Sequence, residues 1–192
     1  NGPDNEEIAA KGDWLTGDVV EFVFDELPLA LPPPLPAPAV GDRFGRSVAS
    51  IGDLNNDGVD DLAVGAHYTD LYKGAVYLLF MKADGTVKNT AKIDSSSHAN
   101  LSSLGDRDFF GVSIANMGDL NKDGVNDLAV GAHGTQSEGS VYILYMNSNG
   151  SAKNVLKIDS SDDHIDLKGN DSFGVSVANI GDLNNDGIDD LA

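Results

Sequence analysis

Residues 53–66 read Asp-Leu-Asn-Asn-Asp-Gly-Val-Asp-Asp-Leu-Ala-Val-Gly-Ala. The same pattern returns at residues 119–132 and begins a third time at residues 182–192. In each copy, oxygen-bearing side chains occupy the first, third, fifth and ninth positions, and a glycine follows the fifth. Alternate oxygens around a bend that glycine makes easily are what a hard cation such as Ca²⁺ requires. The sequence therefore predicts three metal-binding loops.

The loops differ from the EF-hand, a helix–loop–helix calcium site that needs a glutamate at its twelfth loop position. That position holds Val64 in the first copy and Val130 in the second. The ninth position is aspartate in every copy, as Asp61, Asp127 and Asp190, and we expect it to be the closing carboxylate. The flanking segments are short and rich in β-branched or small residues, which indicates strand, loop, strand.

A plain Asx-rich turn without metal is the alternative interpretation of a single loop. Such a turn needs a glycine and one aspartate or asparagine, not four aligned oxygens. Because all three copies keep the four oxygen positions, the repetition favours a metal.

Composition sets limits on function. The chain has 192 residues, enough for one good core, and 31 acidic against 12 basic residues give a formal net charge of −19. We therefore expect no binding of nucleic acid or of anionic lipid through general electrostatics. Cysteine is absent, which excludes disulfides and thiolate metal sites. The apolar runs are too short to span a bilayer, so no membrane insertion of this chain is expected.

Residues 1–40 form a separate segment by composition, because they contain all seven prolines. Residues 27–40 are proline-rich and predict a stiff, extended polyproline II linker. Residues 19–24, Val-Val-Glu-Phe-Val-Phe, predict one strand. That strand is either the end of a preceding domain or an N-terminal arm that adds to an open sheet edge, in this chain or a neighbour. We favour the docking arm.

From residue 41 the chain repeats. Phe-Gly pairs begin at Phe44, Phe110 and Phe173, at intervals of about 65 residues. Each complete unit offers two further strands after the loop, at 75–81 with 86–93 and at 140–146 with 152–158. The third strands are apolar on both alternating faces, which is typical of strands covered on both sides. Four short strands per unit predict an all-β fold of β-propeller blades, with repeats at about 41–104, 105–168 and an incomplete 169–192.

These residues resemble the FG-GAP repeat of integrin α-subunit propellers. The Phe-Gly pairs match its first element, and Gly65-Ala66 and Gly131-Ala132 match its second. His67 and His133 stand where the family has proline. The resemblance covers about residues 41–192 and implies a ring of seven blades, which three copies cannot close. Further blades, an assembly of several chains and an open array all remain possible interpretations.

The resemblance also implies a Ca²⁺ ion in the hairpin loop between the first two strands of each blade, about three sites in all. Side-chain ligands carried over from the family come from the four oxygen positions, with a backbone carbonyl at the seventh position. They are Asp53, Asn55, Asp57, Val59 and Asp61; Asp119, Asn121, Asp123, Val125 and Asp127; and Asp182, Asn184, Asp186, Ile188 and Asp190. We assign the metal a structural role.

Family members bind proteins or glycans through the loops opposite the calcium hairpins. In this chain the contacts expected from those loops are Tyr68, Asp70 and Tyr72. The favoured function is a calcium-binding, integrin-like adhesion or ligand-binding module of a secreted or cell-surface protein. Two alternatives remain open: a structural subunit that polymerises by strand donation from residues 1–40, and an accessory domain of a secreted hydrolase. No nucleophile, paired-acid or phosphate-loop signature is visible, so we expect no enzyme activity.

Overall fold

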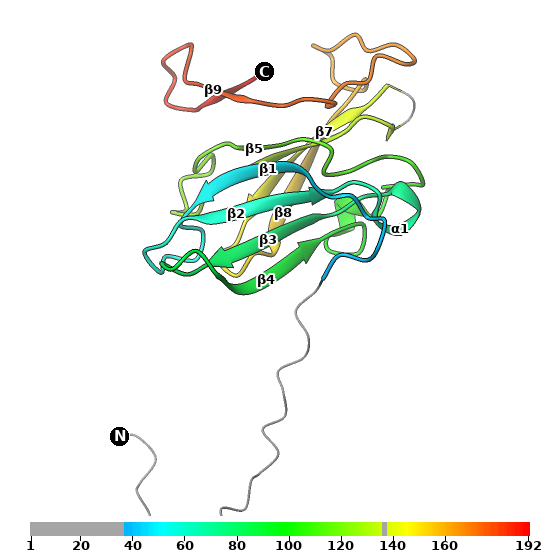
Figure 1. Cartoon of the computed structure of the whole chain (residues 1–192). Coiled ribbons are helices and arrows are strands. Elements are labelled where there is room, and N and C mark those ends of the chain that lie inside the picture. The colour runs from blue at the N-terminus through cyan, green and yellow to red at the C-terminus, as the bar shows by residue number, and fades with distance from the viewer. Residues whose placement is uncertain (1–36, 136–137) are drawn as a thin grey trace, which may run out of the picture. The chain divides into compact units, whose positions relative to one another are not determined.

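The computed structural model describes residues 37–135 and 138–192 (Figure 1). The strand predicted at 19–24 and most of the predicted proline-rich segment lie outside these residues. The described residues form two four-stranded sheets and one two-stranded sheet, all antiparallel. The predicted all-β fold, with two four-stranded blades and a partial third, is therefore confirmed.

The first blade has the strand order β1-β2-β3-β4. Its strands are β1 (Phe44–Gly52), β2 (Asp61–Ala66), β3 (Val76–Met81) and β4 (Val87–Ile93). The two central strands are buried along most of their length, as their apolar residues on both faces predict. β4 is mostly exposed or half-buried because polar residues fill it.

The second blade repeats this order with β5 (Ile114–Asn116), β6 (Leu128–Ala132), β7 (Ser140–Met146) and β8 (Ala152–Ile158). The third sheet pairs only β9 (Asn179–Gly181) with β10 (Asp190–Leu191). Two short turns complete the described elements, α1 (Thr69–Tyr72) and the 3₁₀ turn η1 (Ala99–Leu101). None of the described helices is long and apolar enough to cross a membrane.

One apolar core joins the two four-stranded blades. Its fully buried members include Ile51, Leu54, Val76, Leu78, Phe110, Leu128, Tyr142 and Leu144. In the first two Phe-Gly pairs the phenylalanine meets a tyrosine of its own blade edge to face: Phe44 with Tyr77 at 5.5 Å and Phe110 with Tyr142 at 5.6 Å between ring centroids. The two blades are therefore built on the same contact.

Glycines allow the blades to approach each other closely. A Cβ atom on Gly65 of β2 would overlap the carbonyl oxygen of Gly111 in the second blade. That same oxygen accepts a hydrogen bond of 2.9 Å from the Ser47 hydroxyl. The contact between the second and third blades repeats the arrangement with Gly131, Gly174 and Ser113. The glycines of both motif elements thus serve blade-to-blade packing.

The outer faces of the described blades are less well covered. Phe44 is 43% exposed, whereas its counterpart Phe110 is fully buried by the first blade. Val48 is 59% exposed and Leu183 is 68% exposed, although Leu54, the counterpart of Leu183, is fully buried. Each blade face therefore needs a neighbour to bury its apolar side chains.

The loops of the first blade divide between its two ends. β2 begins at Asp61, next to the predicted metal loop, and ends at Ala66, next to α1. Figure 1 shows the β1–β2 loop and α1 at opposite ends of the sheet. The two sets of residues singled out in the sequence are therefore separated by the length of a strand.

Candidate metal centre

The backbone of the three predicted metal loops has one conformation. The glycine after the fifth position has a φ of 88° at Gly58, 88° at Gly124 and 86° at Gly187. The fourth position is left-handed as well, with φ of 58° at Asn56, 60° at Lys122 and 60° at Asn185. Because only glycine adopts such angles without cost, the invariant glycine follows from the bend itself.

In the first loop, the predicted ligand side chains accept hydrogen bonds from the loop backbone. The carboxylate of Asp53 accepts the N–H of Asp57 at 2.9 Å and that of Gly58 at 2.7 Å. The amide oxygen of Asn55 accepts the Asp57 N–H at 2.9 Å, and Asp57 accepts the Val59 N–H at 3.2 Å. These contacts hold the bend in one shape.

The second and third loops make the same four contacts. In the second loop the acceptors are Asp119, Asn121 and Asp123, and the donors are the N–H groups of Asp123, Gly124 and Val125. In the third they are Asp182, Asn184 and Asp186, with the N–H groups of Asp186, Gly187 and Ile188. The structure thus brings together the first, third and fifth positions of every copy. The predicted role of the carbonyls of Val59, Val125 and Ile188 stays a prediction.

The ninth-position aspartates link each loop to the sheet. Asp61 is fully buried and accepts the N–H of Leu54 at 3.2 Å and of Met81, in β3, at 2.9 Å. Burial raises the pKa of the Asp61 carboxyl, and the two backbone donors partly offset this. Asp127 repeats the burial and the raised pKa with donors from Leu120 and Met146. Asp190 accepts only the Leu183 N–H, at 2.9 Å.

A lysine contact was not predicted from the sequence. The ammonium of Lys88, in β4, lies 2.9 Å from the carboxylate of Asp57, and that of Lys153, in β8, lies 3.0 Å from Asp123. The hydrogen bond from Lys88 is the main reason why the pKa of Asp57 is lowered. The sequence did contain a signal for this contact, because each lysine is the second residue of its strand. Each complete blade therefore places a cation beside the fifth loop position.

The donor chemistry of the loops fits a hard cation, although no metal cluster is formed. Within residues 37–135 and 138–192, no group of three or more His, Cys, Asp or Glu side chains converges so as to hold a metal ion. The aspartate oxygens face backbone N–H groups instead. A carboxylate offers about four lone-pair sites and an amide oxygen two, so each acceptor keeps capacity for a cation. Ca²⁺ prefers such an all-oxygen set.

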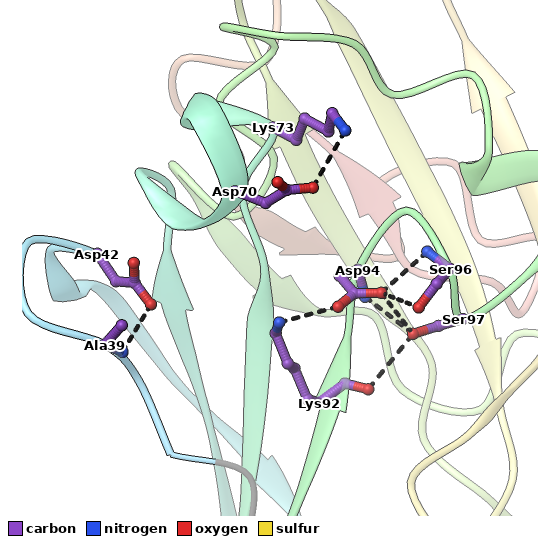
Figure 2. Close-up of polar contacts among 8 residues, drawn as sticks. All are labelled: Ala39, Asp42, Asp70, Lys73, Lys92, Asp94, Ser96 and Ser97. Carbon is purple, nitrogen blue, oxygen red and sulfur yellow. Dashed lines mark hydrogen bonds and ion pairs between the residues drawn. The ribbon is translucent and has the colours of Figure 1, made fainter.

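At the opposite end of the blade, two of the three predicted recognition residues lie together. The rings of Tyr68 and Tyr72 meet edge to face at 4.6 Å between centroids. The carboxylate of Asp70 instead pairs with the ammonium of Lys73 at 3.1 Å, as Figure 2 shows. The Asp70 carboxylate is therefore paired within its own turn in this arrangement.

Two further aspartates close turns at this end of the blades and were not singled out in the sequence. Asp94 follows β4 and binds Lys92 at 2.9 Å and both the N–H and the hydroxyl of Ser96 (Figure 2). Burial alone would raise the pKa of Asp94, but these contacts together lower it to about 2. Asp159 follows β8 with the matching partners Lys157 and Ser161, and its pKa is also lowered to about 2. These turns are part of the scaffold.

Comparison with known proteins identifies the repeats. The profile of the family described as FG-GAP repeat matches residues 44–79 and 110–144. These ranges begin at the two Phe-Gly pairs and end within β3 and β7. Each match therefore contains one complete metal loop and the glycines of the blade contact.

Integrin alpha subunits are similar over most of the chain. Integrin alpha-3 of Cricetulus griseus is 38% identical over 157 residues, which cover 79% of this chain and 14% of that protein. Integrin alpha-5 of Xenopus laevis is 33% identical over 168 residues, 77% of this chain and 14% of that protein. Integrin alpha-11 of Homo sapiens is 42% identical over 92 residues, 48% of this chain and 7% of that protein. The chain thus spans only a small part of these curated relatives. Residues 44–79 and 110–144 are FG-GAP repeats, and the chain is similar to integrin alpha subunits over most of its length.

Proposed function

We propose that this chain is a calcium-binding, integrin-like recognition module of a secreted or cell-surface protein. In this proposal Ca²⁺ braces the β1–β2 type loop of each blade, and the loops at the opposite end contact a protein or glycan ligand. The similarity to integrin alpha subunits supports the adhesion-related context. The module has no catalytic role in this proposal.

The observation that carries the calcium proposal is the repetition of one loop three times. Backbone angles, acceptor atoms and donor atoms agree among the loops, although the chain between them varies. A turn that only connects strands would need the glycine and one Asx residue. The three copies keep a further oxygen at the ninth position, and in two of them that carboxylate is fully buried.

The chain's own residues would act as follows. Asp53, Asn55, Asp57 and Asp61 would hold the ion in the first blade, with the corresponding residues of the other two loops. The bound ion would supply positive charge that offsets the repulsion among three carboxylates in one bend. The backbone hydrogen bonds keep the acceptors oriented before binding, and Asp61 transmits the loop position to β3 through the Met81 N–H.

Thermal and urea unfolding with and without calcium tests this role. Loops of extracellular modules bind Ca²⁺ with dissociation constants of about 10⁻⁴–10⁻³ M. At about 10 mM calcium, each loop should then add roughly 1.4 to 2.7 kcal/mol to the free energy of unfolding. The control is Mg²⁺ at the same ionic strength, which should stabilise much less. Equal unfolding curves in calcium and in EGTA would remove the metal from the proposal.

Matched variants of the loops test which loop binds each calcium ion. Asp53→Asn and Asp119→Asn each weaken one loop, and Asp60→Asn changes the same charge at an exposed position outside the predicted ligand set. Isothermal titration should show one site fewer for either of the first two variants and no change for Asp60→Asn. Loss of all sites in a single variant would mean that the loops do not bind independently.

The exposed blade faces support a larger assembly around the module. Phe44 and Val48 would be buried if a further blade packed on β1, as the second blade packs on the first. We infer that such a neighbour exists in the working protein. The polymerising alternative rests on residues 1–40, of which 1–36 lie outside the described residues, and it stays a prediction, as does the hydrolase alternative.

A further inference from the structure

The three arginines of this acidic chain lie at the same end of the blades. Arg43 precedes β1, Arg46 is in the first part of β1, and Arg107 is in the loop before β5. The chain carries 31 acidic residues, which could have paired each guanidinium. Among residues 37–135 and 138–192, six lysines form ion pairs with aspartates, yet none of the arginines does. All three arginines are exposed.

One of these arginines contacts a cluster of aromatic rings. The guanidinium carbon of Arg43 lies 4.4 Å from the ring centroid of Tyr68. Tyr68 contacts Tyr72 at 4.6 Å and Phe109 at 5.9 Å between centroids. We define the arginine–aromatic patch as Arg43, Arg46, Arg107, Tyr68, Leu71, Tyr72 and Phe109.

The patch spans two blades and is held by backbone hydrogen bonds. The Arg107 N–H donates to the Leu71 carbonyl at 3.2 Å, and the Phe109 N–H donates to the Tyr72 carbonyl at 2.8 Å. The Phe109 ring stacks on His133 at 4.8 Å with an angle of 11° between planes. The patch is therefore a pre-formed surface and does not depend on one loop alone.

Backbone strain is concentrated in the patch. Leu71, Tyr72, Arg107 and Phe109 have φ of 55°, 69°, 69° and 59°. Left-handed angles are costly for residues with large side chains and cluster at binding sites. The angles of Arg107 and Phe109 recur at their counterparts Asn170, with a φ of 71°, and Ser172, with a φ of 59°, so this part of the strain belongs to the repeated blade connection.

Among the described residues, no acidic group beside the patch forms an ion pair with its guanidiniums. Asp70 is paired with Lys73, and Asp42 accepts the Ala39 N–H at 2.8 Å, as Figure 2 shows. Asp108 is buried and accepts the Gly105 N–H. Asp106 is the exposed acid on the Arg107 loop that forms no ion pair among the described residues. Within the described residues, the three guanidiniums are therefore exposed and outside any ion pair.

We propose that the arginine–aromatic patch binds an acidic peptide segment of another protein, in which carboxylates alternate with apolar side chains. Guanidiniums bind carboxylates through two parallel hydrogen bonds. Leu71, 65% exposed, and Tyr72, 40% exposed, provide apolar surface beside them, which favours a peptide over a carboxylated sugar. Tyrosine and arginine also dominate binding energy at protein interfaces. This inference specifies the ligand of the proposed recognition role and rests on it.

The test measures fluorescence anisotropy of a labelled synthetic peptide in which glutamate alternates with leucine and tyrosine. The full chain should bind this peptide and not the same peptide with glutamine in place of glutamate. Arg46→Gln with Arg107→Gln should weaken binding by about tenfold or more, because each removes a charge-assisted contact. The matched control is Lys82→Gln with Lys122→Gln, an equal charge change near the metal loops at residues that form no ion pair, and it should leave binding unchanged.

Three results would overturn the proposal: no binding of the acidic peptide, equal losses in the arginine and lysine variants, and preference for a carboxylated oligosaccharide. Equal losses would mean general electrostatic attraction. Circular dichroism of each variant confirms that the fold is retained. Calcium titration reports on the opposite end of the blades, so this proposal and the calcium proposal can each fail without the other.

Discussion

The two ends of the blades follow opposite rules. At the metal-loop end, three loops share their backbone angles and their hydrogen bonds, down to the same acceptor atoms. At the other end, the turns at Asp94 and Asp159 repeat, but the connections after β2 and β6 differ in length: residues 67–75 link β2 to β3 and contain α1, whereas residues 133–139 link β6 to β7. Repetition indicates a task that every blade must perform, whereas variety indicates a task performed once. The comparison therefore supports the proposal that one end has a structural role and the other a role in recognition.

The charges of the two ends agree with that division. The metal-loop end concentrates aspartates, with one lysine per complete blade beside the fifth loop position. The other end holds all three arginines. Aspartates and ion-paired lysines occur at both ends, so the arginines are what distinguishes the charges of the second end.

The largest expected effect is at the closing aspartate of the second loop. Asp127→Ala leaves the part-buried N–H of Leu120 and the buried N–H of Met146 without an acceptor, which should lower the free energy of unfolding by about 3–5 kcal/mol. Asp190→Ala frees only the Leu183 N–H near the surface and should cost about 1 kcal/mol. Urea unfolding in EGTA measures both without any contribution from metal. Similar small losses in the two variants would mean that the ninth position has no structural role.

The second effect concerns pH at the recognition end. Burial is the main cause that lowers the pKa of His67 to about 4, and its Nδ1 has no hydrogen-bond partner among the described residues. The unfolded chain binds the proton at its ordinary pKa of 6.5, so the fold should lose stability as pH falls from 6.5 to 4. The loss should approach about 3 kcal/mol.

Comparison with His67→Phe isolates this pH effect. The raised pKa values of Asp61 and Asp127 act in the opposite direction, since their protonated forms are favoured in the fold. The wild type and His67→Phe share those aspartates. The change in urea midpoint between pH 7 and pH 5 is measured for each protein, and the difference between the two changes is due to His67. The lowered pKa of His133 contributes in the same direction as His67. If the urea midpoint changed equally with pH in the wild type and in His67→Phe, His67 would be protonated as easily in the fold as in the unfolded chain.

The repeated loops could be predicted from sequence, whereas at the other end the sequence singled out Tyr68 and Tyr72 but not the arginines beside them. The loop pattern, the strand spacing and the Phe-Gly pairs are local signals that recur, so their meaning is reinforced three times. The contact between Lys88 and Asp57 joins residues 31 positions apart, and its only signal is the same lysine in β8. The patch joins residues from before β1, after β2 and before β5. Only the packing of two blades brings these together, and no local pattern records it.

The third effect compares backbone strain at Leu71, in the patch, with backbone strain at Asn56, in the first metal loop. Leu71 is exposed and left-handed, so Leu71→Gly should raise the free energy of unfolding by about 1 kcal/mol. It should also weaken binding of the acidic peptide by removing apolar contact. Asn56→Gly is the matched control at a φ of 58°, where asparagine is already tolerated, and it should change stability very little. Destabilisation by Leu71→Gly would mean that Leu71 packs into the fold and stores no strain.

The smallest effect on stability, and the sharpest test of the lysine contacts, comes from Lys88→Met and Lys153→Met. The ammonium lies within 3.0 Å of a predicted calcium ligand in each blade, so it competes with a cation for the same carboxylate. Surface ion pairs contribute little to folding, and we expect nearly unchanged urea midpoints in EGTA. Calcium affinity should rise a few-fold at the loop of the altered blade, because one positive charge is removed from its surroundings. Titration calorimetry of each single variant, with Lys82→Met as the control on the adjacent hairpin, measures this. Weaker calcium binding would show instead that the lysine orients the aspartate for the ion. The strand that carries the lysine, such as β4, would then help to preorganise the site together with the loop.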